Sequence, residues 1–165
     1  MKDFEKIYTG YVKDVYKFLI KLSGNPDIAE ELTQATFAKA FEHMEQFQGR
    51  CKISVWLCQI AKNEYFMYCR KNRHFSFEEV PESYTQPGSM EEDVIDKDGK
   101  LRILKVLSML PEPYQKVFTL RVMGDVSYRD ISLLFGKSES WARVTYYRAK
   151  GMIIERLGGA DYDAM

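Results

Sequence analysis

The 165-residue sequence lacks the features that mark membrane and secreted proteins. No apolar run approaches the ~20 residues that a membrane-spanning helix needs, so we expect no membrane insertion. The N-terminal stretch carries acidic residues and no uninterrupted apolar core, which argues against a secretory signal. The three cysteines, Cys51, Cys58 and Cys69, are an odd number and contain no short-spaced pair. This usage favours a reducing compartment over a disulfide scaffold, so we expect a cytoplasmic protein.

Motifs for catalysis and for metal binding are missing as well. The sequence has no glycine-rich phosphate loop, no nucleophile elbow and no histidine with a convincing catalytic partner. His74 and the three cysteines are residue types that can bind a metal, but their spacings do not match a zinc signature. We therefore predict that the protein is not an enzyme and that it holds no cofactor and no metal.

Charge is abundant, with equal numbers of both signs, but it is segregated along the chain. Residues 1–75 hold 12 basic and 9 acidic side chains, and residues 100–165 hold 11 basic and 7 acidic side chains. Residues 76–99 hold one basic side chain against eight acidic ones, together with Pro81 and Pro87. This pattern predicts a flexible acidic linker over 76–99 between two mildly basic domains, 1–75 and 100–165, that move relative to each other.

Strand patterning is nearly absent, whereas apolar residues recur at helical spacing on both sides of the linker. The sequence therefore predicts an all-α protein of two small helical domains. Asn25 and Pro26 are typical of a helix start, with Asn as the cap and Pro at the first helical position. We expect helices over about 4–23, 26–47, 54–72, 100–109, 113–123, 127–135 and 138–157.

The last two predicted helices form a candidate helix-turn-helix. Ser132 and Gly136 lie four residues apart, as a helix crossing followed by a tight turn requires, and Ser138 would cap the second helix. On that helix Arg143, Tyr147 and Lys150 share one face, and the small and apolar residues lie opposite. A helix-turn-helix reads the major groove through the N-terminal part of this helix. The alternative is a plain helical hairpin with a solvated charged face.

Two patterns in the first domain suit other partners. Asp27, Glu30, Glu31 and Gln34 share one face of the second predicted helix, although ordinary solvated surface has the same composition. Residues 49–73 hold six basic side chains against one acidic side chain, with aromatic residues interleaved. A basic surface with aromatic rings suits single-stranded DNA, although some of these rings must be core.

Together these motifs resemble a known family. Residues 110–150, LPEPYQKVFTLRVMGDVSYRDISLLFGKSESWARVTYYRAK, resemble the C-terminal DNA-binding domain of a bacterial RNA polymerase sigma factor. Residues 24–41, GNPDIAEELTQATFAKAF, and 47–63, FQGRCKISVWLCQIAKN, resemble the N-terminal domain of the extracytoplasmic-function (ECF) subgroup. The resemblance implies a protein that binds core RNA polymerase, recognises two promoter elements, melts DNA and starts transcription. It also implies an anti-sigma factor as an inhibitory partner.

The resemblance also implies roles for individual residues. The acidic face of the second helix would bind a basic coiled coil on the polymerase clamp through Asp27, Glu30, Glu31 and Gln34. The loop at 50–54 would capture a flipped base of the downstream promoter element, with contacts from Arg50, Lys52, Ile53, Lys62, Asn63 and Arg70. The helix-turn-helix would bind the upstream promoter element through Ser138, Ser140, Arg143, Val144, Tyr147, Arg148 and Lys150.

Two other functions remain open from the sequence. A free-standing helix-turn-helix transcriptional regulator would account for residues 100–165, but it leaves the acidic face and the basic aromatic segment without a role. A helical adaptor would use the charged faces, but it does not account for the turn residues Ser132, Gly136 and Ser138.

Overall fold

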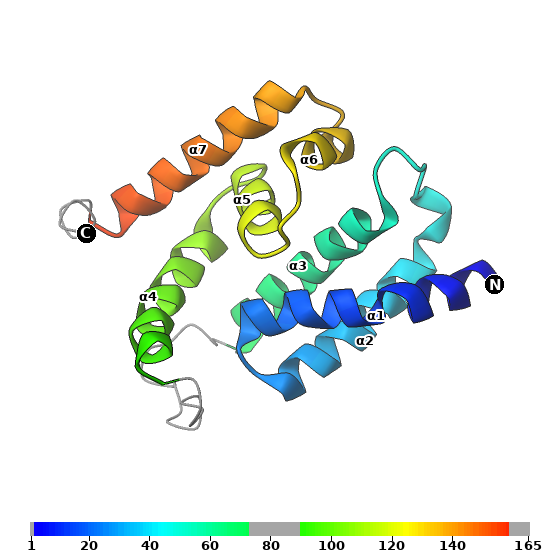
Figure 1. Ribbon diagram of the computed structural model, residues 1–165, viewed down its shortest axis with the longest axis horizontal. Coiled ribbons are helices and arrows are strands. Elements are labelled where there is room, and N and C mark those ends of the chain that lie inside the picture. Colours follow the sequence, from blue (N-terminus) through cyan, green and yellow to red (C-terminus); the bar gives the residue numbers. More distant parts are fainter. Residues whose placement is uncertain (1, 73–89, 159–165) are drawn as a thin grey trace.

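A computed structural model describes residues 2–72 and 90–158, with side chains for 4–72 and 99–158. Within these ranges every regular element is a helix, so the predicted all-α class is confirmed. Figure 1 shows the helices arranged in two groups that lie against each other, with α3 between them. Among the described residues, no helix combines the length and the hydropathy that crossing a bilayer requires.

The N-terminal group holds α1 (Lys2–Ser23), α2 (Pro26–Glu42), the short 3-10 helix η1 (Met44–Gln46) and α3 (Ile53–Asn72). The predicted start of α2 is confirmed, because Asn25 Oδ1 accepts hydrogen bonds from the N–H groups of Asp27 and Ile28 at 2.8 and 3.1 Å. The predicted end near Phe47 is wrong. The α-helix stops at Glu42, and η1 covers part of the remainder.

The C-terminal group holds α4 (Met90–Met109), α5 (Tyr114–Val122), α6 (Tyr128–Phe135) and α7 (Glu139–Arg156). We predicted that the first of these would begin near Lys100, and it begins ten residues earlier, inside the predicted linker. The rest of the predicted linker, residues 76–89, lies outside the described residues.

The turn chemistry predicted for the helix-turn-helix is confirmed. Ser127 Oγ accepts a hydrogen bond from the N–H group of Asp130 at 3.1 Å, which caps α6. Gly136 ends α6 in the left-handed region, with φ 66°, where a side chain would be strained. Ser138 Oγ then accepts a hydrogen bond from the N–H group of Trp141 at 3.0 Å, which caps α7. These caps fix the direction in which α7 leaves the turn.

The two groups of helices share an interface, and the predicted motion of the two domains relative to each other stays a prediction. On the N-terminal side α1 and α2 cover one face of α3, and on the other side α5 and α6 contact it (Figure 1). Val55 of α3, at 4% exposure, belongs to an apolar cluster whose other buried members all come from the C-terminal group and the turn before α6, namely Val117, Leu120, Val126, Ile131 and Ala142. The second domain therefore completes its core with a side chain from the first.

The Asn25 cap makes the start of α2 testable. Replacing Asn25 with Ala should lower the free energy of unfolding by about 0.5–2 kcal/mol, because two N–H groups lose their acceptor. Asn63→Ala is the matched control, since Asn63 is exposed within α3 and caps nothing. Urea unfolding followed by circular dichroism measures both, and equal stabilities of the two variants would contradict the role of Asn25.

Candidate nucleic-acid interface

The face of α7 that we assigned to upstream DNA is exposed. Arg143, Val144, Tyr147, Arg148 and Lys150 are all on the solvent side, and so are Ser138 and Ser140 at the N-terminal end of the helix. The opposite face is buried through Ala142, Thr145, Ala149 and Ile153. Tyr147 is 57% exposed and Val144 is 47% exposed, and the Tyr147 ring meets the neighbouring Tyr146 ring edge-on with the centroids 5.1 Å apart. Such groups can contact a thymine methyl in the major groove.

Arg143 is held in position by its neighbours. Its guanidinium carbon lies 5.2 Å from the centre of the Tyr128 ring, and Arg121 lies 4.4 Å from the same ring. Glu139 Oε1 lies 3.8 Å from an amino group of Arg143, one turn earlier on α7. Arg121 in turn donates a hydrogen bond to the Val126 carbonyl at 3.2 Å. The guanidinium of Arg143 is therefore oriented by cation–π and ionic contacts before any ligand arrives.

The acidic face of α2 is also open to solvent. Asp27, Glu30, Glu31 and Gln34 are all exposed. Gln34 donates a hydrogen bond from Nε2 to the Tyr8 hydroxyl at 3.0 Å, so α1 fixes the orientation of its amide. Beside this face α1 and α2 enclose a groove of about 330 Å³, lined by Val12, Lys13, Tyr16, Lys17, Glu30, Thr33 and Gln34.

The residues assigned to downstream DNA do not all lie on one open surface. Arg50 and Lys52, in the loop before α3, and Asn63 and Arg70, on α3, are exposed. Ile53, which starts α3, is half-buried and packs on the main apolar cluster. Lys62 departs from the expectation, because its side chain is only 2% exposed and is directed at the C-terminal helices. One residue step turns a helix by about 100°, so Asn63 faces solvent while Lys62 is covered.

Lys62 is buried in a polar site supplied by the start of α5. Its ammonium donates to Gln115 Oε1 at 2.7 Å and to Glu112 Oε2 at 3.3 Å. Burial lowers the pKa of Lys62 from 10.5 to about 8, and the Glu112 carboxylate opposes this effect. A lysine in this position cannot contact DNA in the same arrangement of the two domains.

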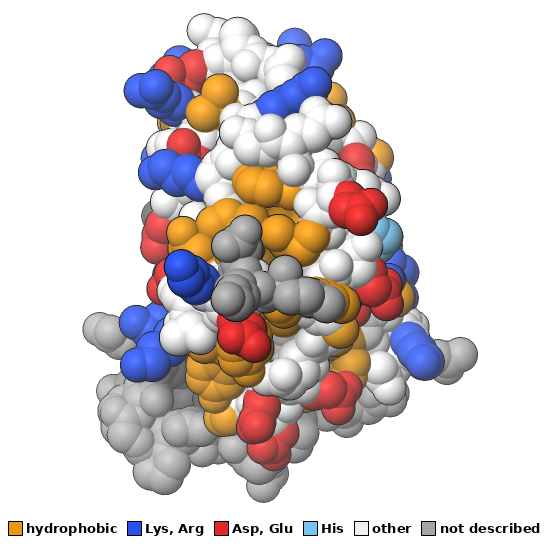
Figure 2. All heavy atoms as spheres, turned by 90° about the vertical axis from the view of Figure 1, so that its right-hand side faces the viewer, with side chains coloured by type: hydrophobic (Ala, Val, Ile, Leu, Met, Phe, Trp, Pro, Cys, Tyr) orange, Lys and Arg blue, Asp and Glu red, His pale blue; other side chains and the backbone are white. Residues whose placement is uncertain are grey.

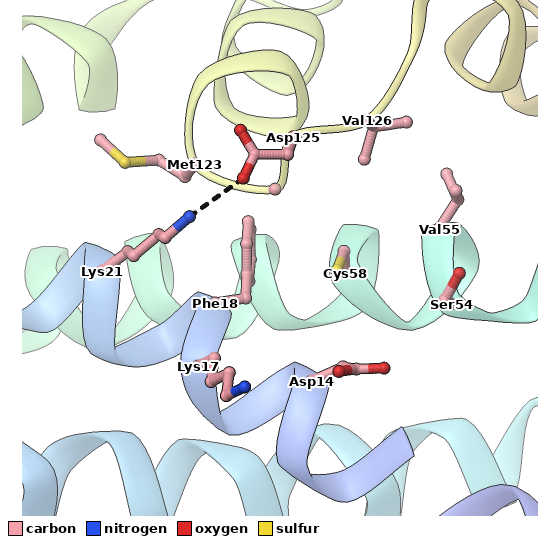
Figure 3. A pocket seen from close by; sticks show the side chains of 11 residues that line it. Asp14, Lys17, Phe18, Lys21, Ser54, Val55, Cys58, Met123, Asp125 and Val126 are labelled. Carbon is pink, nitrogen blue, oxygen red and sulfur yellow. Dashed lines mark hydrogen bonds and ion pairs between the residues drawn. The ribbon is translucent and has the colours of Figure 1, made fainter. Parts of the chain in front are cut away.

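Two further ion pairs cross the interface. Lys52 Nζ lies 3.3 Å from Asp130 Oδ2 on α6, beside a hollow of about 490 Å³ that separates the 49–52 loop from the start of α6. Lys21 Nζ of α1 lies 3.1 Å from Asp125 Oδ2 in the turn after α5. Figure 3 shows the second pair beside a pocket, with Phe18, Cys58 and Val55 directed towards the 123–126 turn. The pocket has a volume of about 310 Å³.

The surface charge is mixed on the side of the molecule that Figure 2 shows. Hydrophobic side chains gather in the middle of this side, and basic and acidic groups surround them. No band of a single sign crosses it, which agrees with the formal net charge of zero. Since the formal net charge is zero, attraction to phosphate depends on local clusters such as Arg50 with Lys52.

The three cysteines are unpaired, and two of them lie in apolar surroundings. Burial raises the pKa of both Cys58 and Cys69 to about 12, so these thiols stay protonated at neutral pH. Within the described ranges, no three histidine, cysteine or acidic side chains come together as metal ligands. His74, the fourth residue of the metal site considered from the sequence, lies outside the described residues.

Sequence analysis missed the residues that hold the DNA-binding candidates in place. Tyr128 and Arg121 orient Arg143, and Glu112 with Gln115 binds Lys62. The i,i+4 spacing of Glu139 and Arg143 was a usable signal. The contacts between Lys62 and the start of α5 join residues 50 or more positions apart, and no local sequence pattern predicts them.

Comparisons with known proteins cover both groups of helices. The family model described as Sigma-70 region 2 matches residues 7–75, and the one described as Sigma-70, region 4 matches residues 100–153. The ECF RNA polymerase sigma factor SigM of Bacillus subtilis is 30% identical over 151 residues, covering 88% of this chain and 90% of that protein. The RNA polymerase sigma factor YlaC of the same organism is 27% identical, covering 88% and 87%.

Solved structures agree on the fold. The sigma factor RpoE of Bartonella quintana, solved in complex with the anti-sigma factor NepR, aligns with a TM-score of 0.51 at 23% identity, over 95% of this chain and 98% of that one. CnrH, solved in complex with the cytosolic domain of CnrY, aligns with a TM-score of 0.52 at 14% identity, over 96% and 89%. At these identities the likeness supports the arrangement of helices alone.

The titration of Lys62 tests the buried polar site. In the intact chain its ammonium should lose its proton with a pKa of about 8. Glu112→Gln should lower the Lys62 pKa further, because the carboxylate stabilises the charged form. NMR of isotopically labelled lysine side chains measures both values. A Lys62 pKa near 10.5 in the native chain would mean that the ammonium is in water.

Proposed function

Because the chain belongs to the ECF RNA polymerase sigma factors, we propose that it binds core polymerase through α2 and reads promoter DNA through two separate surfaces. As a member of that family it serves transcription initiation and is not itself an enzyme. The observation that carries the proposal is the conjunction of both sigma regions, in the family's order, with an open recognition face on α7. A family in which polymerase does the chemistry also fits a cytoplasmic protein.

The recognition helix α7 supports binding to the upstream promoter element. Its N-terminus is capped by Ser138, and the exposed Ser140 follows within the first turn, where hydroxyl and N–H groups suit phosphate oxygens. Arg143, one turn on, is oriented by Tyr128 and Glu139 and can present two donors to a guanine. Val144 and Tyr147 add apolar contacts, and Arg148 and Lys150 add positive charge for the backbone.

The acidic face of α2 supports binding to polymerase. Asp27, Glu30 and Glu31 present carboxylates to solvent, and Gln34 is held beside them by Tyr8. A cluster of this kind fits a basic helical partner, because charge-assisted hydrogen bonds give orientation as well as attraction. The adjoining groove between α1 and α2 offers apolar contact next to the charged contacts.

The loop before α3, together with the exposed side of α3, supports binding to the melted downstream element. Arg50 and Lys52 carry positive charge beside the start of the helix, and Asn63 offers an amide to a base edge. Extracting a base from the duplex costs a few kcal/mol, so contacts made only with the extracted base must offset that cost. We include Lys62 in this surface only for an arrangement in which the C-terminal helices have moved away.

An anti-sigma factor is a further proposed partner. The Bartonella relative was solved with its anti-sigma factor NepR bound. A protein that covered the acidic face of α2 would keep this chain from polymerase without touching its DNA-binding helix.

The division of labour between α2 and α3 predicts two opposite defects. Asn63→Ala should leave polymerase binding intact and reduce promoter opening, because Asn63 is exposed beside the proposed single-strand surface. Asp27→Lys combined with Glu31→Lys should abolish polymerase binding. Co-purification with core polymerase measures polymerase binding, and permanganate reactivity of promoter thymines measures promoter opening.

The control for charge is Glu42→Lys combined with Glu45→Lys, which makes the same change at two exposed acids near the end of α2. This control should bind polymerase as the native chain does. Full polymerase binding by the Asp27 and Glu31 variant would remove α2 from the polymerase interface. Normal opening by the Asn63 variant would remove Asn63 from the downstream surface.

The orientation of Arg143 predicts a defect in base discrimination. Arg143→Ala should cost about 1–3 kcal/mol at one guanine position of the upstream element and relax the preference there. Tyr128→Leu should cause a smaller loss at the same position, because it removes the ring that orients the guanidinium and keeps an apolar side chain. Competition between single-base variants of a selected promoter, with holoenzyme, measures both effects.

Arg148→Ala is the matched comparison for a backbone contact. It should weaken binding to all promoter variants alike and reduce the salt slope by about one. If Arg143→Ala behaves in that uniform way, the guanine contact is absent.

A further inference from the structure

A pocket of about 310 Å³ lies where α1, α3 and the turn after α5 meet, and no part of the proposed function uses it. We propose that it is a binding site for a small zwitterion with an apolar body, which is the chemistry of a free apolar amino acid. None of the side chains that we assign to polymerase or to DNA lines this pocket. Its occupancy can be measured without either partner, so the inference can be tested separately from the proposed function.

The floor of the pocket is apolar. Phe18 of α1 is buried and belongs to the main apolar cluster, whereas Val55 and Val126 belong to the cluster of the C-terminal half. Cys58 packs against both clusters, and Figure 3 shows it between α1 and the turn after α5. Protein interiors are normally packed as densely as organic crystals. A gap of this volume between two clusters therefore leaves apolar surface that a ligand can cover.

The turn after α5 is shaped for a close approach to α1. Gly124 has no side chain, and a Cβ atom there would lie 2.9 Å from a carbonyl oxygen of α5 and 3.4 Å from Phe18 Cε1. Asp125 follows with φ 52°, in the left-handed region that is costly for a residue with a side chain. Its carboxylate pairs with Lys21 of α1 at 3.1 Å. This ion pair holds the turn against α1 beside the pocket.

Two further charges of opposite sign border the pocket. Asp14 and Lys17 lie three positions apart on α1, and both are exposed. In the part of the chain described with side chains, neither has an ion-pair partner, whereas Lys21 and Asp125 are paired with each other. A ligand therefore meets one available carboxylate and one available ammonium beside the apolar floor. A molecule that carries both an ammonium and a carboxylate complements these two charges, and a plain acid or amine complements only one.

The thiol of Cys58 lies within the field of Asp14. Burial raises the pKa of Cys58 to about 12, and the Asp14 carboxylate adds to this effect. The thiol is therefore protonated at neutral pH, and a protonated thiol is a poor nucleophile. The site consequently holds its ligand by apolar contact and charge, and not by a covalent bond to sulfur.

The volume of the pocket limits the size of the ligand. Small-molecule sites usually span about 300–1,000 Å³, so this pocket is at the small end of that range, which favours a single amino acid over a peptide. Because the walls come from α1, α3 and the turn after α5, a bound ligand contacts both halves of the chain and stabilises the native state by mass action. Together with the proposed function, such a site would let the level of a free amino acid affect transcription.

Methyl NMR of the full chain, with leucine and phenylalanine as the probes, tests whether the pocket binds. With labelled methionine and valine methyl groups, the signals of Met123, Val55 and Val126 should shift in a saturable way as either probe is added. The methyl signal of Met67, which is exposed on α3 outside the pocket, should not move. Signals of Met123, Val55 and Val126 that stay fixed up to the solubility limit of both probes would overturn the proposal.

Two analogues of leucine test the assignment of charge. N-acetylleucine lacks the ammonium and leucinamide lacks the carboxylate, so the native chain should bind each about two- to fivefold more weakly than leucine, as expected for exposed ion pairs. In Asp14→Asn, leucine and N-acetylleucine should bind equally. In Lys17→Gln, leucine and leucinamide should bind equally. Equal binding of leucine and both analogues by the native chain would show that the ligand is not recognised as a zwitterion, and would overturn the proposal.

Lys13→Gln separates this pocket from the neighbouring groove. Lys13 is exposed next to Asp14, but it lines the groove between α1 and α2 and not this pocket, whereas Lys17 borders both. Lys13→Gln should therefore bind leucine as the native chain does. A loss equal to that of Lys17→Gln would place the ligand in the groove and contradict the proposal. Failure of the native chain to direct transcription with core polymerase would overturn the proposed function instead, and the binding results would still stand.

Discussion

The stripe of α3 formed by Val55, Cys58, Gln59 and Lys62 is the feature on which the arrangement of the two halves depends. Its opposite face is committed to α1 and α2, where Leu57, Ala61 and Tyr65 are fully buried. The C-terminal helices use the remaining face to complete their own apolar cluster through Val55. One helix thus serves as the core of the first domain and as the docking surface of the second.

This double use of α3 links structure to function. Asn63 and Arg70, which we propose as DNA contacts, are exposed on α3, the helix that α5 and α6 also contact. The face of α7 that we propose for upstream DNA and the acidic face of α2 are both exposed.

The local features of this fold could be predicted from sequence, and the long-range ones could not. The caps at Asn25 and Ser138 depend on neighbouring N–H groups, so residue type and spacing were sufficient. The burial of Lys62 depends on Gln115, which is 53 positions away. In the sequence Lys62 is simply a basic residue next to DNA-binding candidates, so its burial could not be predicted. The early start of α4 at Met90 was missed because its composition reads as linker.

Reconstituted transcription tests the central claim, that this chain is a specificity subunit whose two DNA surfaces work only with polymerase. Core polymerase, the purified chain and a library of promoter fragments would be combined, with each protein also tested alone. The account predicts transcripts with defined start sites only when both proteins are present. Sequence-specific binding of duplex DNA by the chain alone, with no defined transcripts in the complete mixture, would contradict it and would indicate a free-standing regulator.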